Sequence, residues 1–464
     1  MTDDLLQSDL FTFESDASLD ELTAILEGAE RVYLKKLSLN DWQWSENSSA
    51  HQGGVYIPHQ DRDSGFFPAL SLKERAASGA PIREIWFDLH WPQAETTKTA
   101  RLVHYTSKGQ ETHLTNVVKE PFRGVSPASF LVIARRRLDS GELQFTAFVA
   151  DSGGLGVGYL HDLFRFDSNF ISGCFVPEAA ARESADRAFS YVEQAVRAWR
   201  EGSLIEFAAA HAMIPSTSRM AELAQAEYMN TNSLSSLNPF TLAAPGDALM
   251  RISRDIEYRL FKDFELRARS VELIRIVFGT DSAAVTAEGA IRSLITEFPR
   301  IDKVLLSAAQ QRKSRAGKSF ELHIERLLKD GGVPYEAQVV IESKKRPDFV
   351  LPDFLLYSDS ARTRQEALVL SAKTTLRERW KQVHSEIQNC DLYLATVDEN
   401  VAATVISEMA EAGICLVVPE SLKTSDAAVY RRQANVISFA EFFETHIRKH
   451  RFPLWRARYP KPLK

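Results

Sequence analysis

Three charged residues in the C-terminal half have the types and the spacing that phosphodiester hydrolysis needs. Asp348 follows Arg346-Pro347, Lys373 closes an apolar run that begins at Leu368, and Glu386 comes thirteen residues later. Carboxylates are preferred Mg²⁺ ligands, and a lysine beside them can stabilise the charge that develops on phosphate. The set predicts a nuclease centre in which Asp348 and Glu386 hold Mg²⁺ and a water beside Lys373 is the nucleophile.

The segments around these residues alternate between strand and helix patterns. Apolar runs typical of strands lie at 335–341, 349–351, 367–372, 392–396 and 414–418, and helical patterns lie at 317–329, 376–389, 401–412 and 439–446. Such alternation predicts a mixed sheet flanked by helices. Asp348 and Lys373 would stand at strand ends, and Glu386 would come from the following helix.

In this order and on these elements, the three residues resemble the PD-(D/E)XK nuclease motif, in the variant whose second acid has moved to a helix. The surrounding strings resemble the catalytic half of the EcoRII-like (type IIE) restriction endonucleases; the similar strings are 313–323, 345–349, 373–375 with 379–380, and 416–419. The likeness covers about residues 213–445. It implies a Mg²⁺-dependent type II enzyme that cuts double-stranded DNA at a short palindrome containing CC…GG (CCWGG/CCNGG-like).

The same resemblance adds residues to the site. A helix glutamate after Gly-x-x-Phe is a usual fourth element of this nuclease core, which implies a role for Glu321, with Glu325 one turn later as the alternative. Arg377-Glu378-Arg379 follows the catalytic lysine directly. Arginine suits bidentate bonds to guanine and glutamate accepts from cytosine, so the triplet can read C·G pairs, as a basic-acidic-basic triplet does in the related enzymes. An exposed helix start with an internal ion pair is the other interpretation.

The N-terminal half has a strand-rich pattern between residues 31 and 150. Its runs lie at 32–34, 55–57, 85–87, 102–105, 130–133 and 143–149, which predicts a barrel or sandwich. Blocks 32–38 and 51–58 resemble the effector DNA-binding domain of the EcoRII type, a β-pseudobarrel like that of plant transcription factors. The resemblance implies effector DNA contacts by Lys35, His51, Tyr56 and Lys108. A barrel that only contacts the catalytic domain is the alternative.

Length and composition set the remaining bounds. A chain of 464 residues predicts two or three domains, which we place at 1–175 (effector pseudobarrel), 176–212 (helical connector) and 213–464 (catalysis and dimerisation). A net charge of -6 argues against a protein that coats DNA non-specifically. The apolar stretches are too short for a membrane span and the N-terminus is acidic, so we expect a cytoplasmic protein. Cys174, Cys390 and Cys415 form no CxxC pair, which argues against disulfides and structural zinc.

The expected partners follow from the palindrome and from the family. A palindrome read on both strands predicts a homodimer through the catalytic domains. The resemblance also implies regulation by a second, effector DNA site and a cognate DNA methyltransferase in the same system, without a stable complex. Two other functions fit the fold: a non-catalytic DNA-binding regulator and a structure-specific repair nuclease. The intact set of Asp348, Lys373 and Glu386 counts against the first, and the second has no need of the 377–379 triplet.

Overall fold

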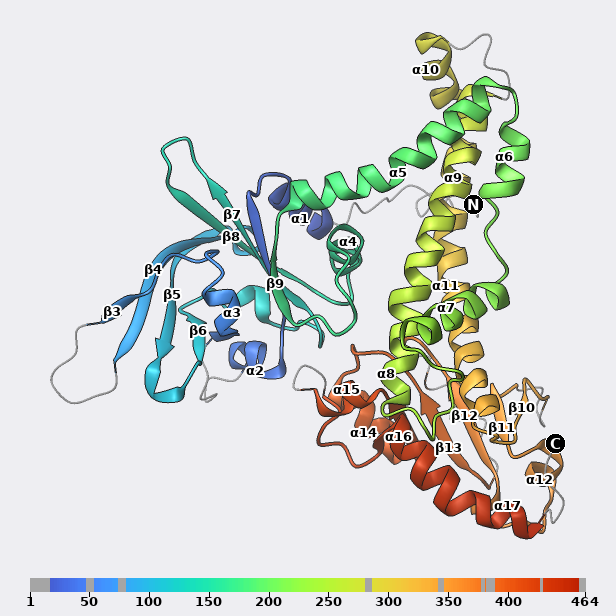
Figure 1. Cartoon of the computed structure of the whole chain (residues 1–464). Coiled ribbons are helices and arrows are strands. Elements are labelled where there is room, and N and C mark those ends of the chain that lie inside the picture. The colour runs from blue at the N-terminus through green and yellow to red at the C-terminus, as the bar shows by residue number, and fades with distance from the viewer. Residues whose placement is uncertain are drawn as a thin grey trace, which may run out of the picture. The chain divides into compact units, whose positions relative to one another are not determined.

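The computed structural model describes residues 17–46, 54–73, 81–279, 286–340, 346–376, 380, 389–425 and 429–458. The chain divides after Ala185 into two compact units (Figure 1). Within the described ranges, no helix has the length and the apolar character required to cross a membrane.

The first unit is built on a nine-stranded sheet. Its strands follow the order β2-β6-β5-β4-β8-β7-β1-β9, with β3 paired to β4, and every pairing is antiparallel except that of β4 with β8. Each of the six predicted runs lies inside a strand, so the strand-rich pattern is confirmed. The strands are β1 (Arg31–Lys36), β2 (Gly54–Ile57), β3 (Ser71–Lys73), β4 (Ile82–Trp91), β5 (Thr96–Tyr105), β6 (Thr112–Thr115), β7 (Phe130–Arg137), β8 (Leu143–Ala150) and β9 (Ser172–Phe175).

Alternating side chains along β1 face two separate cores. Tyr33 packs in a core with Trp91 and Phe122, whereas Val32 and Leu34 pack in a second core. The helices α1 (Ala17–Glu27) and α4 (Leu155–Phe164) supply apolar side chains to that second core. Because successive side chains of a strand point to opposite faces, the sheet encloses one core and is covered by helices on its other face.

Helices make up the first part of the second unit. They are α5 (Pro177–Arg200), which begins in the first unit, α6 (Leu204–His211), α7 (Thr217–Thr231), α8 (Pro245–Met250), the π-helix η5 (Arg251–Glu257), α9 (Tyr258–Phe278), α10 (Ala287–Thr296) and α11 (Phe298–Asp330). The predicted helix at 317–329 is the last part of α11, which is far longer. α9 and α11 run side by side, with α10 at their far end (Figure 1).

The remaining strands form a six-stranded mixed sheet in the order β10-β11-β12-β13-β14-β15. The pairs β10–β11 and β11–β12 are antiparallel, and the next three pairs are parallel. The strands are β10 (Glu336–Ala337), β11 (Phe349–Leu351), β12 (Leu368–Ala372), β13 (Asp391–Ala395), β14 (Ile414–Val418) and β15 (Val436–Ser438). The mixed sheet confirms the sequence prediction, although β10 is shorter than the predicted run and β15 was not predicted.

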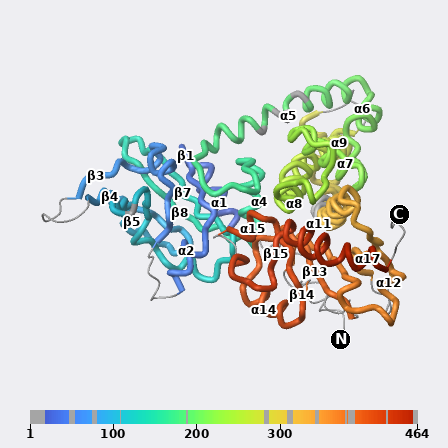
Figure 2. Tube along the Cα trace, turned by 60° about the horizontal axis from the view of Figure 1, so that its bottom comes forward, coloured from blue at the N-terminus to red at the C-terminus, as the bar shows by residue number. Residues whose placement is uncertain are grey.

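Helices cover this sheet. α14 (Ala403–Glu411) packs against β14, and α11 packs against β12. The C-terminal helix, η9 (Phe442–Arg451) continued by α17 (Phe452–Arg458), lies along the strands, where the Phe442 ring contacts Tyr393 of β13 at 5.0 Å between centroids (Figure 2). The predicted helices at 401–412 and 439–446 are therefore present. Most of the predicted helix at 376–389 lies outside the described residues.

Candidate active site

Asp348 and Lys373 meet because they flank two neighbouring antiparallel strands. Asp348 precedes β11 and Lys373 follows β12, and the register pairs Phe349 with Leu370. The pairing brings Asp348 to the end of β12, where its Oδ2 accepts a hydrogen bond from the backbone N–H of Ala372 at 2.8 Å. The two residues thus come from connected elements, as the sequence predicted.

An ion pair joins the two side chains. Lys373 Nζ donates to Asp348 Oδ2 at 2.8 Å and to the carbonyl oxygen of Ala372 at 3.0 Å. The Asp348 side chain is 9% exposed and that of Lys373 is 26% exposed. The ammonium therefore borders solvent, where a substrate phosphate could reach it, while the carboxylate is held by charge-assisted hydrogen bonds of the strong kind.

Glu321 brings a second carboxylate to Asp348 from α11. Its Oε2 accepts from Lys318 Nζ at 2.9 Å, one turn earlier on the helix, and from Gln338 Nε2 at 3.1 Å. The Gln338 amide nitrogen also lies 3.4 Å from Asp348 Oδ1. Burial raises the pKa of Glu321, and the nearby charge of Asp348 raises it further, whereas the hydrogen bond from Lys318 lowers it.

Glu325, the alternative acid, is engaged elsewhere. It accepts a hydrogen bond from the Tyr335 hydroxyl at 3.1 Å. Burial, together with the charge of Glu325, raises the pKa of Tyr335 to about 12, so the hydroxyl keeps its proton and remains a donor. The shared amide of Gln338 therefore favours Glu321 over Glu325 as the acid beside Asp348.

Four predicted site residues lie outside the described residues: Glu386 and the triplet Arg377-Glu378-Arg379. Leu376, the residue before this triplet, is within the described residues. The backbone N–H of Leu376 donates to Asp398 Oδ2 at 2.8 Å, and Asp398 lies just beyond β13. This bond links Leu376, the residue before the triplet, to the segment after β13.

The described carboxylates fit a hard divalent cation. Asp348 and Glu321 converge on one amide nitrogen, and Mg²⁺ is usually held by one or two carboxylates together with water and substrate phosphate. Among the residues with described positions, no cluster of three or more His, Cys, Asp or Glu side chains forms a complete metal cage.

Of the four predicted effector residues, Lys35 and Tyr56 have described side chains. His51 and the side chain of Lys108 lie outside the described residues. The ring of Tyr56 on β2 contacts His113 of β6, with 5.8 Å between centroids. Both rings are partly exposed, so Tyr56 is accessible for the DNA contact that the sequence predicted.

Lys35 instead lies inside the first unit, with 3% of its surface exposed. Its Nζ is 3.3 Å from Asp41 Oδ2, and Asp41 also accepts from the backbone N–H of Ser38 at 2.9 Å and of Tyr56 at 2.7 Å. The Asp41 carboxylate therefore links the turn after β1 to β2. The burial favours a structural role for Lys35 over the predicted DNA contact.

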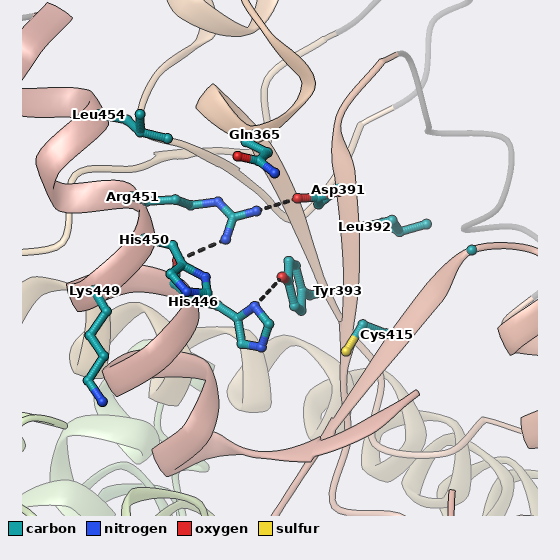
Figure 3. A pocket seen from close by; sticks show the side chains of 11 residues that line it. Gln365, Asp391, Leu392, Tyr393, Cys415, His446, Lys449, His450, Arg451 and Leu454 are labelled. Carbon is teal, nitrogen blue, oxygen red and sulfur yellow. Dashed lines mark hydrogen bonds and ion pairs between the residues drawn. The ribbon is translucent and has the colours of Figure 1, made fainter. Parts of the chain in front are cut away.

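A cavity of about 560 Å³ lies elsewhere in the second unit, between β13, β14 and η9 (Figure 3). Arg451 bonds to Asp391 at 2.6 Å across it, and the Tyr393 hydroxyl lies 2.8 Å from His446 Nδ1. None of the described catalytic residues lines this cavity. Its polar contacts attach η9 to the sheet, so we assign catalysis to the Asp348 cluster instead.

Sequence reasoning missed Gln338 and Lys318 as partners of the acids. Lys318 lies within the string 313–323 that resembles the family. Because residues three apart on a helix are neighbours, its spacing from Glu321 could have predicted their ion pair. Gln338 has no such signal, because its position depends on the turn that follows β10.

Comparisons with known proteins match both halves of the chain. A family model described as EcoRII C terminal matches residues 286–443. The chain is 27% identical over 418 residues to the type II restriction enzyme EcoRII of Escherichia coli, covering 84% of this chain and 88% of that protein. It is 32% identical over 168 residues to the type II restriction enzyme SsoII of Shigella sonnei, covering 34% of this chain and 53% of that protein.

Two solved structures are also similar. Metal-depleted Ecl18kI in complex with uncleaved DNA is 25% identical, with a TM-score of 0.44, over 57% of this chain and 86% of that chain. The PspGI–substrate DNA complex is 20% identical, with a TM-score of 0.38, over 51% of this chain and 95% of that chain.

Proposed function

We propose that the chain is an EcoRII-like type II restriction enzyme that hydrolyses double-stranded DNA at a short palindrome containing CC…GG, with Mg²⁺ as cofactor. The observation that carries the proposal is the contact of Asp348 with Lys373 at 2.8 Å, with Glu321 joined to Asp348 through one amide. These are the residue types that cleavage of a phosphodiester requires.

The side chains proposed for the site have distinct tasks in this reaction. Asp348 and Glu386 would hold Mg²⁺ beside Glu321, and the ion supplies Lewis-acid polarisation of the scissile phosphate. The Ala372 N–H orients the Asp348 carboxylate, which leaves Oδ1 on the side of Glu321. The Lys373 ammonium stabilises the negative charge that develops on the phosphate as water attacks, because a preorganised cation acts most strongly on charge that appears in the transition state.

Sequence readout and regulation use other parts of the chain. We assign readout of the C·G pairs to Arg377, Glu378 and Arg379, which follow Leu376 in the sequence. We assign binding of a second, effector copy of DNA to residues 1–175, read as a β-pseudobarrel, with Tyr56, His51 and Lys108 as contacts. Residues 176–212 connect it to the catalytic and dimerisation domain, 213–464. The enzyme would act in the cytoplasm, with a cognate DNA methyltransferase protecting the host sites.

Exposed apolar side chains support a homodimer through the catalytic domain. They gather on α10 and on the first part of α11, where Ile295 is 71% and Phe298 is 63% exposed; the others are Ile291, Leu294, Leu305 and Leu306. Large exposed apolar patches mark protein–protein contacts. A second copy is the partner that a palindromic site calls for.

Digestion of plasmid DNA with Mg²⁺ tests this function. Discrete bands that disappear with EDTA and with Lys373→Ala are the expected result. DNA binding without cutting would instead identify a regulator, and cutting confined to junctions or ends would identify a repair nuclease.

A further inference from the structure

Gln338 occupies an unusual backbone position next to the acids. It follows β10 and has a φ of 55°, in the left-handed region that favours glycine and asparagine. Its N–H donates to the carbonyl oxygen of Asp348 at 3.1 Å. This bond fixes the Gln338 backbone to the residue that carries the catalytic carboxylate.

The side chain of Gln338 then links two elements. Its Nε2 donates to Glu321 Oε2 of α11 at 3.1 Å and lies 3.4 Å from Asp348 Oδ1 beside β11. A primary amide has two N–H donors on one nitrogen, so it can serve both carboxylates at once. Within the described residues, Gln338 is the side chain that contacts both acids.

The lysines of the site cannot do this. Lys318 donates a hydrogen bond to Glu321 Oε2 and Lys373 donates one to Asp348 Oδ2, so each lysine hydrogen-bonds to one acid, although the charge of Lys373 also acts on Glu321. The two carboxylates repel one another, and a donor shared between them opposes that repulsion. An uncharged amide holds them together without the fixed positive charge that would compete with a divalent cation.

We propose that Gln338 is a positioning residue that holds Asp348 and Glu321 at a separation suited to one divalent cation and so sets the metal affinity of the site. The inference rests on the proposed metal-dependent function. Residues that orient ligands by hydrogen bonds commonly change metal affinity by about 10- to 100-fold when they are replaced.

The test is Mn²⁺ binding to the full-length chain, measured by the loss of the free-ion EPR signal. Gln338→Gly removes the amide and suits a positive φ, so the fold is preserved. Gln338→Asn also suits this φ but is one methylene too short to reach both acids. We expect both variants to bind Mn²⁺ about 10-fold more weakly or worse. Asn116→Gly is the matched control, because Asn116 has a φ of 57° directly after β6, in the first unit, and should bind as the wild type does.

Cleavage as a function of Mg²⁺ concentration separates positioning from direct catalysis. Gln338→Gly should need more Mg²⁺ for half-maximal rate but approach the wild-type maximum at saturation. A maximum that stays low at saturating Mg²⁺, or wild-type Mn²⁺ affinity in Gln338→Gly, would overturn the inference. If the wild type binds Mn²⁺ with the predicted dependence on Gln338 but cuts no DNA, the proposed function fails and the role of Gln338 in metal binding stands.

Discussion

At the scale of single residues, two short strands decide where the chemistry occurs. Asp348 precedes β11 and Lys373 follows β12, and the antiparallel register places their charged groups 2.8 Å apart. The Asp348 carboxylate is nearly buried, so its orientation depends on the N–H of Ala372 as well as on Lys373. A change to either charged side chain should therefore affect the reaction far more than DNA recognition.

We expect Asp348→Asn and Lys373→Ala to reduce cleavage by at least about 100-fold, because each removes a metal ligand or charge stabilisation in the transition state. Specific binding to a duplex that contains the site, measured by fluorescence anisotropy without metal, should persist in both. Lys329→Ala, which changes an exposed lysine at the end of α11, is the control and should cut normally. Wild-type turnover by Asp348→Asn or Lys373→Ala would refute their assignment.

The proximity of Asp348 and Lys373 could be predicted, because strands that pair in the fold also follow one another in the sequence. Asp348 and Lys373 border consecutive strands, so their spacing was informative. Gln338 could not be predicted, because its role arises from a left-handed turn and from a helix seventeen residues earlier. The burial of Lys35 could not be predicted either. It depends on Asp41, whose carboxylate contacts Lys35 Nζ and accepts from Ser38 and from the backbone N–H of Tyr56.

At the scale of elements, the largest difference between expectation and structure is the length of α11. The helix runs from Phe298 to Asp330, whereas the pattern predicted 317–329. Pro299 in its first turn and Gly331 at its end are ordinary boundary signals. Gly317 in the interior costs about 1 kcal/mol relative to alanine, which the flanking turns offset. The three-residue β15 was missed because Val436–Ser438 runs directly into the helical pattern at 439–446.

The exposed face of α10 and α11 gives a prediction about assembly. Ile295→Asp places a charge among the exposed apolar side chains Ile291, Leu294 and Phe298. A charge buried there without a partner should weaken a dimer strongly. Light scattering should give about twice the chain mass of 52.2 kDa for the wild type and the chain mass for Ile295→Asp.

Thr296→Asp is the control for this surface, because it adds the same charge at the adjacent exposed polar position and should leave the dimer intact. A dimer that persists in Ile295→Asp would move the interface elsewhere. A wild-type monomer, both free and on DNA, would contradict the two-fold assembly itself.

At the scale of the whole molecule, the boundary between the units lies inside α5. The second half of this helix belongs to the second unit, where Tyr191 and Ala195 pack with Leu204 of α6 and Val271 of α9. The Tyr191 hydroxyl also donates to the carbonyl oxygen of Arg267 at 2.8 Å. The predicted helical connector thus contributes to the core of the second unit.

Deletion of residues 1–185 tests the proposed regulation. If an empty effector domain restrains the catalytic unit, effector DNA must favour the unrestrained state, and removal of the domain should have the same effect. The truncated chain should form a dimer and cut a single-site plasmid at least as fast as the full chain. Slower cutting by a folded, dimeric truncation that still binds the site would make the first unit an affinity or specificity module.

The end point of the deletion matters. Removal of residues 1–212 also takes Tyr191, Ala195 and Leu204 and uncovers Val271. Burial of one Leu side chain contributes about 1.5–3 kcal/mol, so this shorter chain should unfold at lower urea than the 186–464 chain. Equal urea midpoints, measured by circular dichroism, would contradict the structural role of the connector.

Run-off sequencing of the ends of a digested plasmid tests the central claim most directly. The protein is incubated with Mg²⁺ and a plasmid of known sequence, and every cut end is mapped on both strands. We predict that all ends fall at one fixed position relative to a single palindrome containing CC…GG, and that Lys373→Ala yields none. Ends scattered over unrelated sequences, or no ends from the wild type, would contradict the claim.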